Sequence, residues 1–262
     1  MKRAALLLAG MLTASSSAQA RVDPSAFRAL AFREHPGAEL PLDAALKDEA
    51  GRPVRLAQAF HGRPAIVVLE YLRCRNLCSL VLGGAVKALD DSREAPGRDL
   101  DLIAISIDPR DTPGDAAAAA SGYASRFRNP AAARSGMHFL TGSPAEVARI
   151  ARTIGFPYRF DRASNQFLHP AGFVVATPTG RISRYMLGLN PDGATLRSAL
   201  AEAGQGSVAP AAHPLLLLCF GYDPDEGTAA ALAMRLVRWV TLGVILCCAL
   251  LVGFLSLRRR SA

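Results

Sequence analysis

The fold is decided by the stretch Arg63-Pro64-Ala65-Ile66-Val67-Val68-Leu69-Glu70-Tyr71, which is a continuous run rich in β-forming residues. This run predicts a central strand that is buried on both faces of its sheet. Two cysteines, Cys74 and Cys78, follow the strand at once. Residues 78–89 then carry apolar side chains at helical spacing, which predicts a helix that opens at the cysteines.

Strands and helices continue to alternate along the chain in both directions from this point. We expect strands at 100–107 and 137–140, helices at 113–127, from Ser143 onward and at 191–203, and a hairpin of strands 171–176 and 181–186. This order predicts an α/β sandwich with a mixed central sheet. The predicted domain covers residues 51–203 and follows an irregular N-terminal extension at 21–50.

Both ends of the chain have the composition of membrane-targeting segments. Residues 1–20 have a positive start, a short apolar stretch and a small-residue cleavage site, which predicts a secretory signal peptide. Beyond a linker and juxtamembrane segment at 204–235, residues 236–257 are apolar and long enough for a C-terminal transmembrane helix. Residues 258–262 are rich in arginine and are expected to stay in the cytoplasm. The prediction is an exported domain that is tethered by its C-terminal helix.

The positive charge of the chain follows mostly from this topology. The formal net charge is +8. Two of the positive charges lie in the predicted signal peptide and three in the predicted tail, so about +3 remains on the exported part. We therefore expect no nucleic-acid surface.

The cysteine pair has two chemical uses that its spacing does not separate. Cys74 and Cys78 follow the C-terminal end of a predicted central strand, which is the edge where ligands collect in open α/β sheets. The N-terminus of a helix would favour the thiolate form. Thiolates select Cu(I), zinc or iron–sulfur, but two cysteines this close also permit a disulfide. Metal binding and thiol redox chemistry both remain open on the spacing alone.

A third ligand would favour metal binding, and the chain has five histidines from which it could come. His169 lies at the entrance to the predicted hairpin, beside the central strands, and an imidazole joined to two thiolates suits both Cu(I) and Cu(II). The alternative for His169 is a loop histidine bonded to the backbone. We expect His138 to be a half-buried structural residue of a strand. The remaining histidines fall in predicted loops and receive no functional weight: His35, His61 and His213.

Several short motifs occur in a fixed order between about Pro41 and Pro224. They are Gly51-Arg52-Pro53-Val54-Arg55-Leu56, Tyr71-x-x-Cys74-x-x-x-Cys78, Ser106-Ile107-Asp108-Pro109-Arg110-Asp111-Thr112-Pro113, His138-Phe139-Leu140-Thr141-Gly142, the His169 segment, Pro178-Thr179-Gly180-Arg181-Ile182-Ser183-Arg184-Tyr185 and Leu218-Cys219-Phe220-Gly221-Tyr222-Asp223-Pro224. With these motifs the chain resembles the SCO/SenC family of copper-binding cytochrome c oxidase assembly proteins, in particular its membrane-tethered bacterial branch.

This resemblance implies a thioredoxin-like fold and one copper ion bound through Cys74, Cys78 and His169. It implies a copper metallochaperone that delivers the metal to the dinuclear copper site of cytochrome c oxidase subunit II, or that reduces the cysteines of that site beforehand. An upstream copper donor is a further implied partner. The implied location is the bacterial inner membrane, with the soluble domain in the periplasm.

The chain departs from the family pattern at two places. The family usually has proline after the first motif cysteine, where this chain has Arg75. A cation there stabilises a neighbouring thiolate but adds positive charge beside the metal. The family's tail motif has histidine where this chain has Gly221, so Cys219 lacks the partner for a further copper site. Cys247 and Cys248, within the predicted membrane span, are expected to be apolar filler.

Three functional classes remain after the resemblance is taken into account. The leading one is a metallochaperone, a binding and transfer protein that turns over no substrate. The second is a thiol–disulfide oxidoreductase using Cys74 and Cys78, which is disfavoured because redox proteins of this type have Cys-x-x-Cys. The third is a peroxidase or redox sensor on the same fold, with Arg73 or Arg75 beside an activated thiol.

Other motif residues are expected to have structural roles. Asp108 should end a strand and accept hydrogen bonds from local backbone amides. Tyr71 should pack in the core. The remaining residues are expected to be solvated: Arg110, Arg126, Arg128 and Arg134.

Overall fold

The predicted central strand is strand β3 (Ala65–Glu70), and all six of its residues are buried. In the computed structural model, which describes residues 30–73, 78–162, 164–210 and 239–241, its side chains alternate between two apolar clusters. Ile66 and Val68 belong to the cluster on one face of the sheet, and Val67 and Leu69 to the cluster on the other face. Burial on both faces explains why the run is apolar without alternation.

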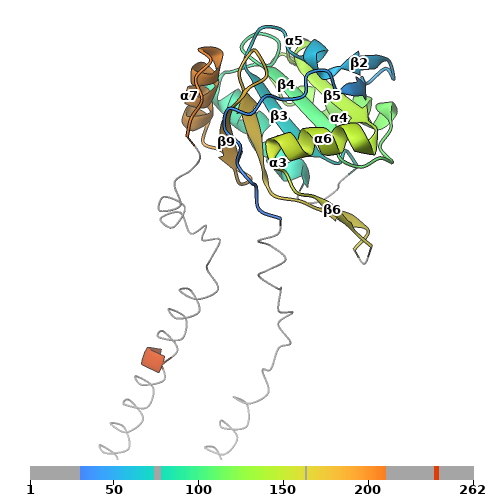
Figure 1. Cartoon of the computed structure of the whole chain (residues 1–262). Helices are drawn as coiled ribbons and strands as arrows, with labels where there is room; N and C mark the ends of the chain where they lie inside the picture. Colours follow the sequence, from blue (N-terminus) through green and yellow to red (C-terminus); the bar gives the residue numbers. More distant parts are fainter. Residues whose placement is uncertain (1–29, 74–77, 163, 211–238, 242–262) are drawn as a thin grey trace, which may run out of the picture.

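Seven strands form one mixed sheet, in the order β2-β1-β5-β4-β3-β8-β9. β3 pairs in parallel with β4 and antiparallel with β8, so it is central as predicted. The strands are β1 (Ala45–Lys47), β2 (Pro53–Arg55), β3, β4 (Asp101–Ser106), β5 (Met137–Gly142), β8 (Gly172–Ala176) and β9 (Ile182–Leu187). A separate antiparallel pair is formed by β6 (Arg159–Asp161) and β7 (Gln166–Leu168). Figure 1 shows this pair extending away from the main sheet.

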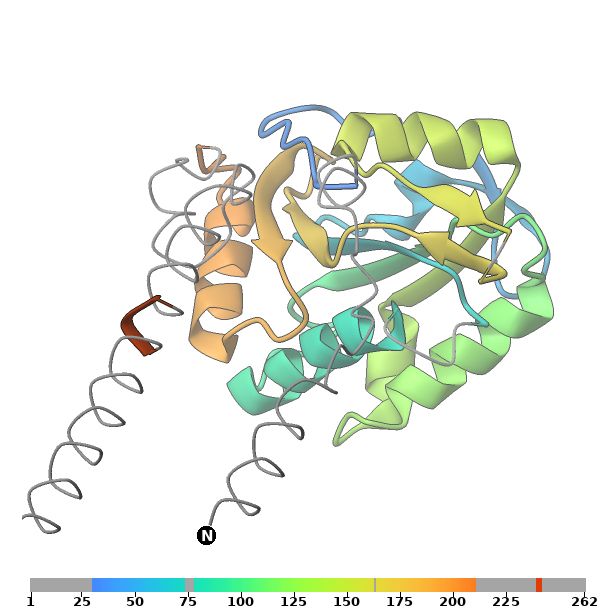
Figure 2. The same cartoon turned by 90° about the horizontal axis from the view of Figure 1, so that it is seen from below.

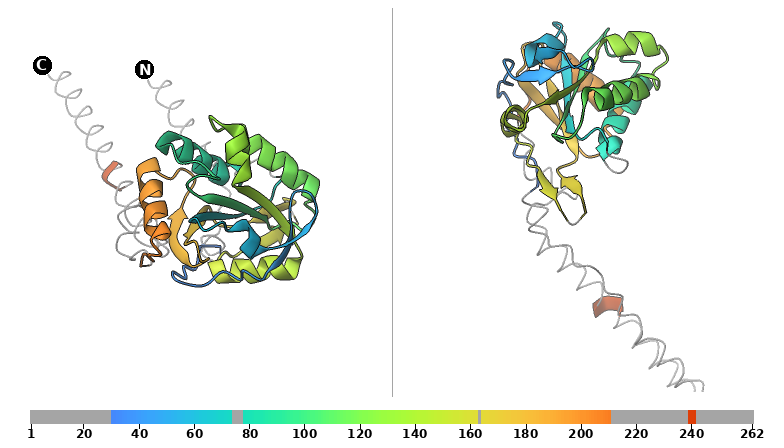
Figure 3. Two further views of the ribbon diagram at one scale, coloured as in Figure 1. Left: turned by 90° about the horizontal axis from the view of Figure 1, so that it is seen from above. Right: turned by 90° about the vertical axis from the view of Figure 1, so that its right-hand side faces the viewer.

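Helices cover both faces of the sheet, as Figures 2 and 3 show from several sides. One cluster joins the sheet to four helices, and its members include Leu82, Ala120, Ala133 and Leu196. The other cluster joins it to helix α6, for example through Ile150. The helices are η1 (Leu56–Ala59, a 3-10 helix), α3 (Cys78–Ser92), α4 (Pro113–Ala124), α5 (Pro130–Ser135), α6 (Pro144–Ile154) and α7 (Gly193–Gly204). The predicted α/β sandwich with a mixed sheet is confirmed.

Local sequence signals account for the ends of several helices. Ser143 is the N-cap of α6 and accepts a hydrogen bond from the Glu146 amide, and Pro144 is the first helical residue, as predicted. α6 ends at Gly155, which has a φ of 68°, a left-handed conformation that glycine adopts without a side-chain clash. The hairpin of β8 and β9 is also confirmed, with its turn at Gly180.

The structure adds elements that the sequence did not predict. The predicted helix 113–127 ends at Ala124, and a second helix, α5, starts at Pro130, because the residue before a proline disfavours helical geometry. β1 lies within the segment expected to be irregular, and it pairs with β5 through Leu46 and Gly142. Strands of three residues are too short to show a periodic pattern, so β1, β2, β6 and β7 could not be predicted.

The predicted targeting segments lie outside the residues that the structure describes. This holds for the signal peptide, the tail, and the membrane span apart from residues 239–241. Within the described ranges, no helix combines the length and apolarity needed to cross a bilayer. The signal peptide, the linker and the C-terminal tether therefore remain predictions.

Candidate functional site

The candidate site lies at the end of β3, where the chain leaves the sheet. Tyr71 is buried directly after the strand, and Arg73 is the last described residue before the cysteine segment. The described part of helix α3 runs from Cys78 to Ser92, within the range where a helix was predicted. Cys74 and the side chain of Cys78 lie outside the described part of the chain. The assignment of these two cysteines as ligands therefore remains a prediction.

A buried carboxylate holds the strand end that leads to Cys74. Asp111 Oδ2 accepts hydrogen bonds from the Leu72 backbone N–H at 2.7 Å and from the Ser106 hydroxyl at 2.7 Å, while Oδ1 accepts one from Arg73 Nε at 2.8 Å. The Asp111 side chain is fully buried, whereas that of Arg73 is half exposed. These bonds fix the direction in which the backbone leaves β3. The hydrogen bond raises the pKa of Arg73, which stays cationic near the thiols.

A second carboxylate organises the turn after β4. Asp108 Oδ1 accepts hydrogen bonds from the Arg110 amide at 2.9 Å and from Arg110 Nε at 2.8 Å, which confirms the predicted bonding to local backbone. Burial would raise the pKa of Asp108, but the hydrogen bonds from Arg110 outweigh it and the pKa is lowered. Arg110 also places its guanidinium 5.0 Å from the centre of the Phe160 ring. Arg110 is therefore more than the solvated surface residue that the sequence suggested.

The sheet places His169 beside the same strand end. β8 runs antiparallel to β3, with Ala65 opposite Ala176 and Val67 opposite Val174. Continued past the paired residues, this register would bring His169 opposite Leu72, two residues before Cys74. A side-chain contact agrees with that position, because the ring of Tyr71 meets the ring of His169 edge-on with 6.2 Å between their centres. The predicted location of His169 beside the central strands is confirmed.

The surroundings of His169 favour a neutral imidazole with a defined tautomer. Its Nδ1 lies 2.8 Å from the Pro170 carbonyl oxygen, so Nδ1 carries the proton and donates it to that carbonyl. In this tautomer Nε2 carries the lone pair. The ring stacks on Phe156 with 5.4 Å between centres. Burial lowers the pKa of His169, which keeps the imidazole neutral near pH 7, the form that binds metals.

Only some of the residues singled out in the sequence lie in the part of the chain that the structure describes. His169 and Tyr71 are brought together at the carboxyl ends of the central strands, and Tyr71 packs in the core as expected. The predicted backbone bond to His169 also exists, and it is made by Nδ1. Cys219 and Gly221 lie outside the described residues. Arg75 does as well.

Sequence reasoning missed Asp111, whose motif was interpreted only as a strand end and a turn. The bond from Leu72 to Asp111 joins residues 39 positions apart, so no local pattern could have revealed it. It also missed a group of three residues at the opposite end of the sheet, where His61 and His138 approach Asp101.

The fold and the strand-end site define an α/β protein of the thioredoxin-like class, with a mixed sheet between layers of helices. The family model described as SCO1/SenC matches residues 40–205, which is more than half of the sequence. The chain therefore belongs to the SCO1/SenC family. No protein with a curated description is significantly similar to it.

Solved structures support the fold assignment. A proposed electron transfer protein from Aquifex aeolicus VF5 shares 25% identity and superposes with a TM-score of 0.57, over 68% of this chain and 99% of that one. ScoI of Arabidopsis thaliana, solved with copper bound, is 22% identical, with a TM-score of 0.50 over 66% and 98%. BsSco, described as a cytochrome c oxidase assembly protein with a disulfide switch, is 18% identical, with a TM-score of 0.50 over 66% and 97%. At these identities, the two Sco proteins show a shared fold.

Proposed function

We propose that this protein is a copper metallochaperone, which binds one copper ion through Cys74, Cys78 and His169. The observation that supports this most directly is the position of His169, whose ring meets Tyr71 at the strand end leading to Cys74. Membership of the SCO1/SenC family and the copper-bound state of the Arabidopsis ScoI structure agree with the proposal.

The donor set fits copper. Two thiolates are soft ligands that suit Cu(I), and an added imidazole also accommodates Cu(II). Cys78 is the first described residue of α3, and a position near the start of a helix would favour the thiolate form of its side chain. Asp111 holds the backbone before Cys74, and the Pro170 carbonyl orients the imidazole through Nδ1–H, a second-shell bond of the kind that aligns metal-binding histidines.

Copper is the cargo in this proposal, and its receiver is the dinuclear copper site of cytochrome c oxidase subunit II. An upstream donor would load the protein. The predicted signal peptide and C-terminal helix would hold the domain on the periplasmic side of the bacterial inner membrane. No nucleic acid is involved.

A thiol–disulfide oxidoreductase acting on the cysteines of the same copper site is the second candidate. The disulfide switch described for BsSco favours considering it for a protein of this fold. The two functions use the same cysteines but differ in their need for His169. A thiol exchange reaction needs no imidazole ligand, whereas a stable Cu(II) complex gains a third donor from it.

The test is a Cu(II) titration of the full-length protein, of the His169→Ala variant and of a His35→Ala control. His35 is an exposed histidine whose ring bonds the Thr153 carbonyl, so the control removes an imidazole that is not proposed to bind copper. We expect His169→Ala to lower Cu(II) affinity by about 10-fold or more and to change the sulfur-to-copper charge-transfer band. The control should match the parent.

The proposal is contradicted if His169→Ala leaves the copper spectrum and affinity unchanged. Should the Cys74–Cys78 pair then exchange disulfides with subunit II, the oxidoreductase function replaces it. A deletion strain provides the cellular counterpart: recovery of the dinuclear copper centre on added copper supports delivery, and recovery only on added reductant supports thiol chemistry.

A further inference from the structure

A second group of possible metal ligands lies at the other end of the central strands. His61 precedes β3, Asp101 is the first residue of β4, and His138 is the second residue of β5. These three strands run parallel, so the three residues gather at their amino ends. The cysteine segment follows the carboxyl end of β3. The group is therefore separate from the proposed copper site.

The three side chains are already close to a ligating arrangement. One nitrogen or oxygen ligand atom from each residue lies within 4.8 Å of the others. The backbone N–H of His61 donates to Asp101 Oδ2 at 2.8 Å, and His61 Nδ1 lies 3.3 Å from Asp101 Oδ1. The rings of His61 and His138 stack, with 5.0 Å between centres and 21° between planes.

An unsatisfied atom marks the group as incomplete. Among the described residues, Nε2 of His138 is buried and has no hydrogen-bond partner. A buried polar atom without a partner is costly, and its presence in a folded protein calls for an explanation. A neutral imidazole can satisfy such a nitrogen by binding a metal ion through its lone pair.

Asp101 retains the capacity to act as a ligand. Its side chain is fully buried and accepts hydrogen bonds from Arg63 Nη2 at 2.7 Å and from His61. An ionised carboxylate offers about four acceptor positions, and these bonds occupy three of them. The positive charge of Arg63 opposes cation binding, so the affinity should be moderate.

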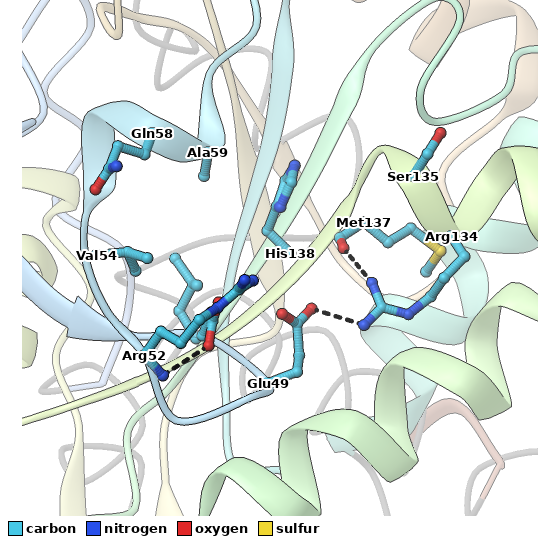
Figure 4. Close-up of a pocket in the computed structure, with 11 residues that line it drawn as sticks. Glu49, Arg52, Val54, Gln58, Ala59, Arg134, Ser135, Met137 and His138 are labelled. Atoms are coloured by element: carbon cyan, nitrogen blue, oxygen red, sulfur yellow. Dashed lines mark hydrogen bonds and ion pairs between the residues drawn. The ribbon is translucent and has the colours of Figure 1, made fainter.

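A pocket next to the group provides solvent access. It has a volume of about 380 Å³, and Figure 4 shows His138 among its lining residues, with Glu49 and Arg52 nearby. Glu49 is paired with Arg134 at 3.3 Å, and Asp48 is paired with Arg52. Apolar side chains such as Val54 and Leu140 complete the lining, and His138 is the proposed ligand that borders the pocket. Water molecules that complete the coordination of a divalent ion would therefore reach it from the side of His138.

We propose that His61, Asp101 and His138 bind one divalent first-row transition-metal ion, such as Zn(II) or Cu(II). Two imidazoles and a carboxylate are a donor set that borderline divalent ions accept, and a pair of histidines with one acidic residue is a known arrangement for zinc. The site has no thiolate, so it should discriminate against Cu(I), which the cysteine pair prefers.

Binding requires a rotation of His61. A metal lies in the plane of each imidazole that binds it, and the two rings now stack nearly parallel. With metal–ligand bonds of about 2.0–2.2 Å, the ligand atoms of a tetrahedral site are about 3.4 Å apart. The side chain of His61 is 45% exposed and can turn about its χ angles to close the remaining distance, while the more buried His138 stays in place.

The experiment uses the full-length protein with Cys74→Ser and Cys78→Ser, so that the proposed copper site is absent. Zinc affinity and stoichiometry are measured by competition with a chromophoric chelator in this parent, and after adding His61→Ala, His138→Ala or His35→Ala. We expect each of the first two additions to lower the affinity of one zinc ion by about 10-fold or more. His35→Ala should bind as the parent does. Cu(II) should show nitrogen hyperfine coupling in electron paramagnetic resonance, and this coupling should diminish in His61→Ala.

If His138→Ala fails to fold, the His61→Ala variant decides the result, because the side chain of His61 is partly exposed and its removal disturbs the core less. Zinc affinity and stoichiometry that are the same in His61→Ala and in His35→Ala would overturn the proposal and would leave the stacked histidines as a structural contact. Because the parent lacks both motif cysteines, this outcome is independent of whether the copper proposal holds.

Discussion

Replacement of Asp111 by alanine tests whether the strand end before Cys74 is held by one carboxylate. The substitution removes the acceptor for the Leu72 backbone N–H, the Ser106 hydroxyl and Arg73 Nε. Ser106 is buried, and Asp111 itself is covered by the surrounding residues, so water reaches this position poorly. The Leu72 N–H therefore loses its acceptor, whereas the Ser106 hydroxyl still has the Asp108 carbonyl oxygen at 3.3 Å.

The magnitude follows mainly from the Leu72 N–H. A buried donor left unsatisfied costs about 1–3 kcal/mol, so the expected loss in the free energy of unfolding is about 2 kcal/mol. Arg73 is half exposed and can be solvated by water, so the loss of its ion pair adds little to the change in the free energy of unfolding. For a domain of this size, about 2 kcal/mol corresponds to a fall of about 4–8 °C in the melting temperature.

The assay compares thermal unfolding of the full-length protein, of Asp111→Ala and of a matched control, Asp43→Ala. Asp43 also pairs with an arginine, Arg149, at 2.9 Å, but its side chain is 65% exposed. The control should melt close to the parent because exposed ion pairs contribute little. Copper affinity, measured where all three proteins are folded, should fall only in Asp111→Ala. Equal melting temperatures for Asp111→Ala and Asp43→Ala would refute the reasoning.

Further predictions concern two helix glycines and one ion pair. A Cβ atom on Gly84 would lie 1.9 Å from the Leu189 carbonyl oxygen, so Gly84→Ala should cost about 1–3 kcal/mol in chemical unfolding. A Cβ on Gly122 in helix α4 meets nothing within 4 Å, and Gly122→Ala should add about 0.5–1 kcal/mol; the reverse order of stability would contradict both assignments. Asp108 has a lowered pKa, so its contribution to stability is present above its unfolded pKa of about 3.9 and disappears as pH falls through the lower folded value. Arg110→Ala should therefore lower the melting temperature at pH 7 and have a smaller effect near pH 3, and an effect that does not change with pH would count against the ion pair.

The elements that could be predicted from the sequence are those whose pattern lies within a few consecutive residues. β3 was evident from its unbroken apolar run, and α6 from the Ser143-Pro144 start, because each signal lies within a few residues. β1 was missed because its three residues become a strand only through pairing with β5, about a hundred positions away in the chain. Such pairing depends on the folded sheet, and no short window of sequence contains it.

The same distinction applies to the functional residues. His169 was identified because it stands next to a predicted hairpin and because the family resemblance includes its segment. The role of Asp111 was not identified, since its partners Leu72 and Arg73 are nearly 40 positions away. His61 was dismissed as a loop histidine, and only the parallel register of β3 and β4 brings it to Asp101.

The two proposed metal sites differ in chemistry and are separated by the length of the central strand. β3 has six residues, which span about 20 Å at 3.3 Å each. At that separation the two sites share no ligand. Thiolates at the carboxyl end favour Cu(I), and imidazoles with a carboxylate at the amino end favour divalent ions. One chain can therefore hold a transferable Cu(I) ion and a zinc ion at once, because ligand softness favours a different metal at each end of the strand.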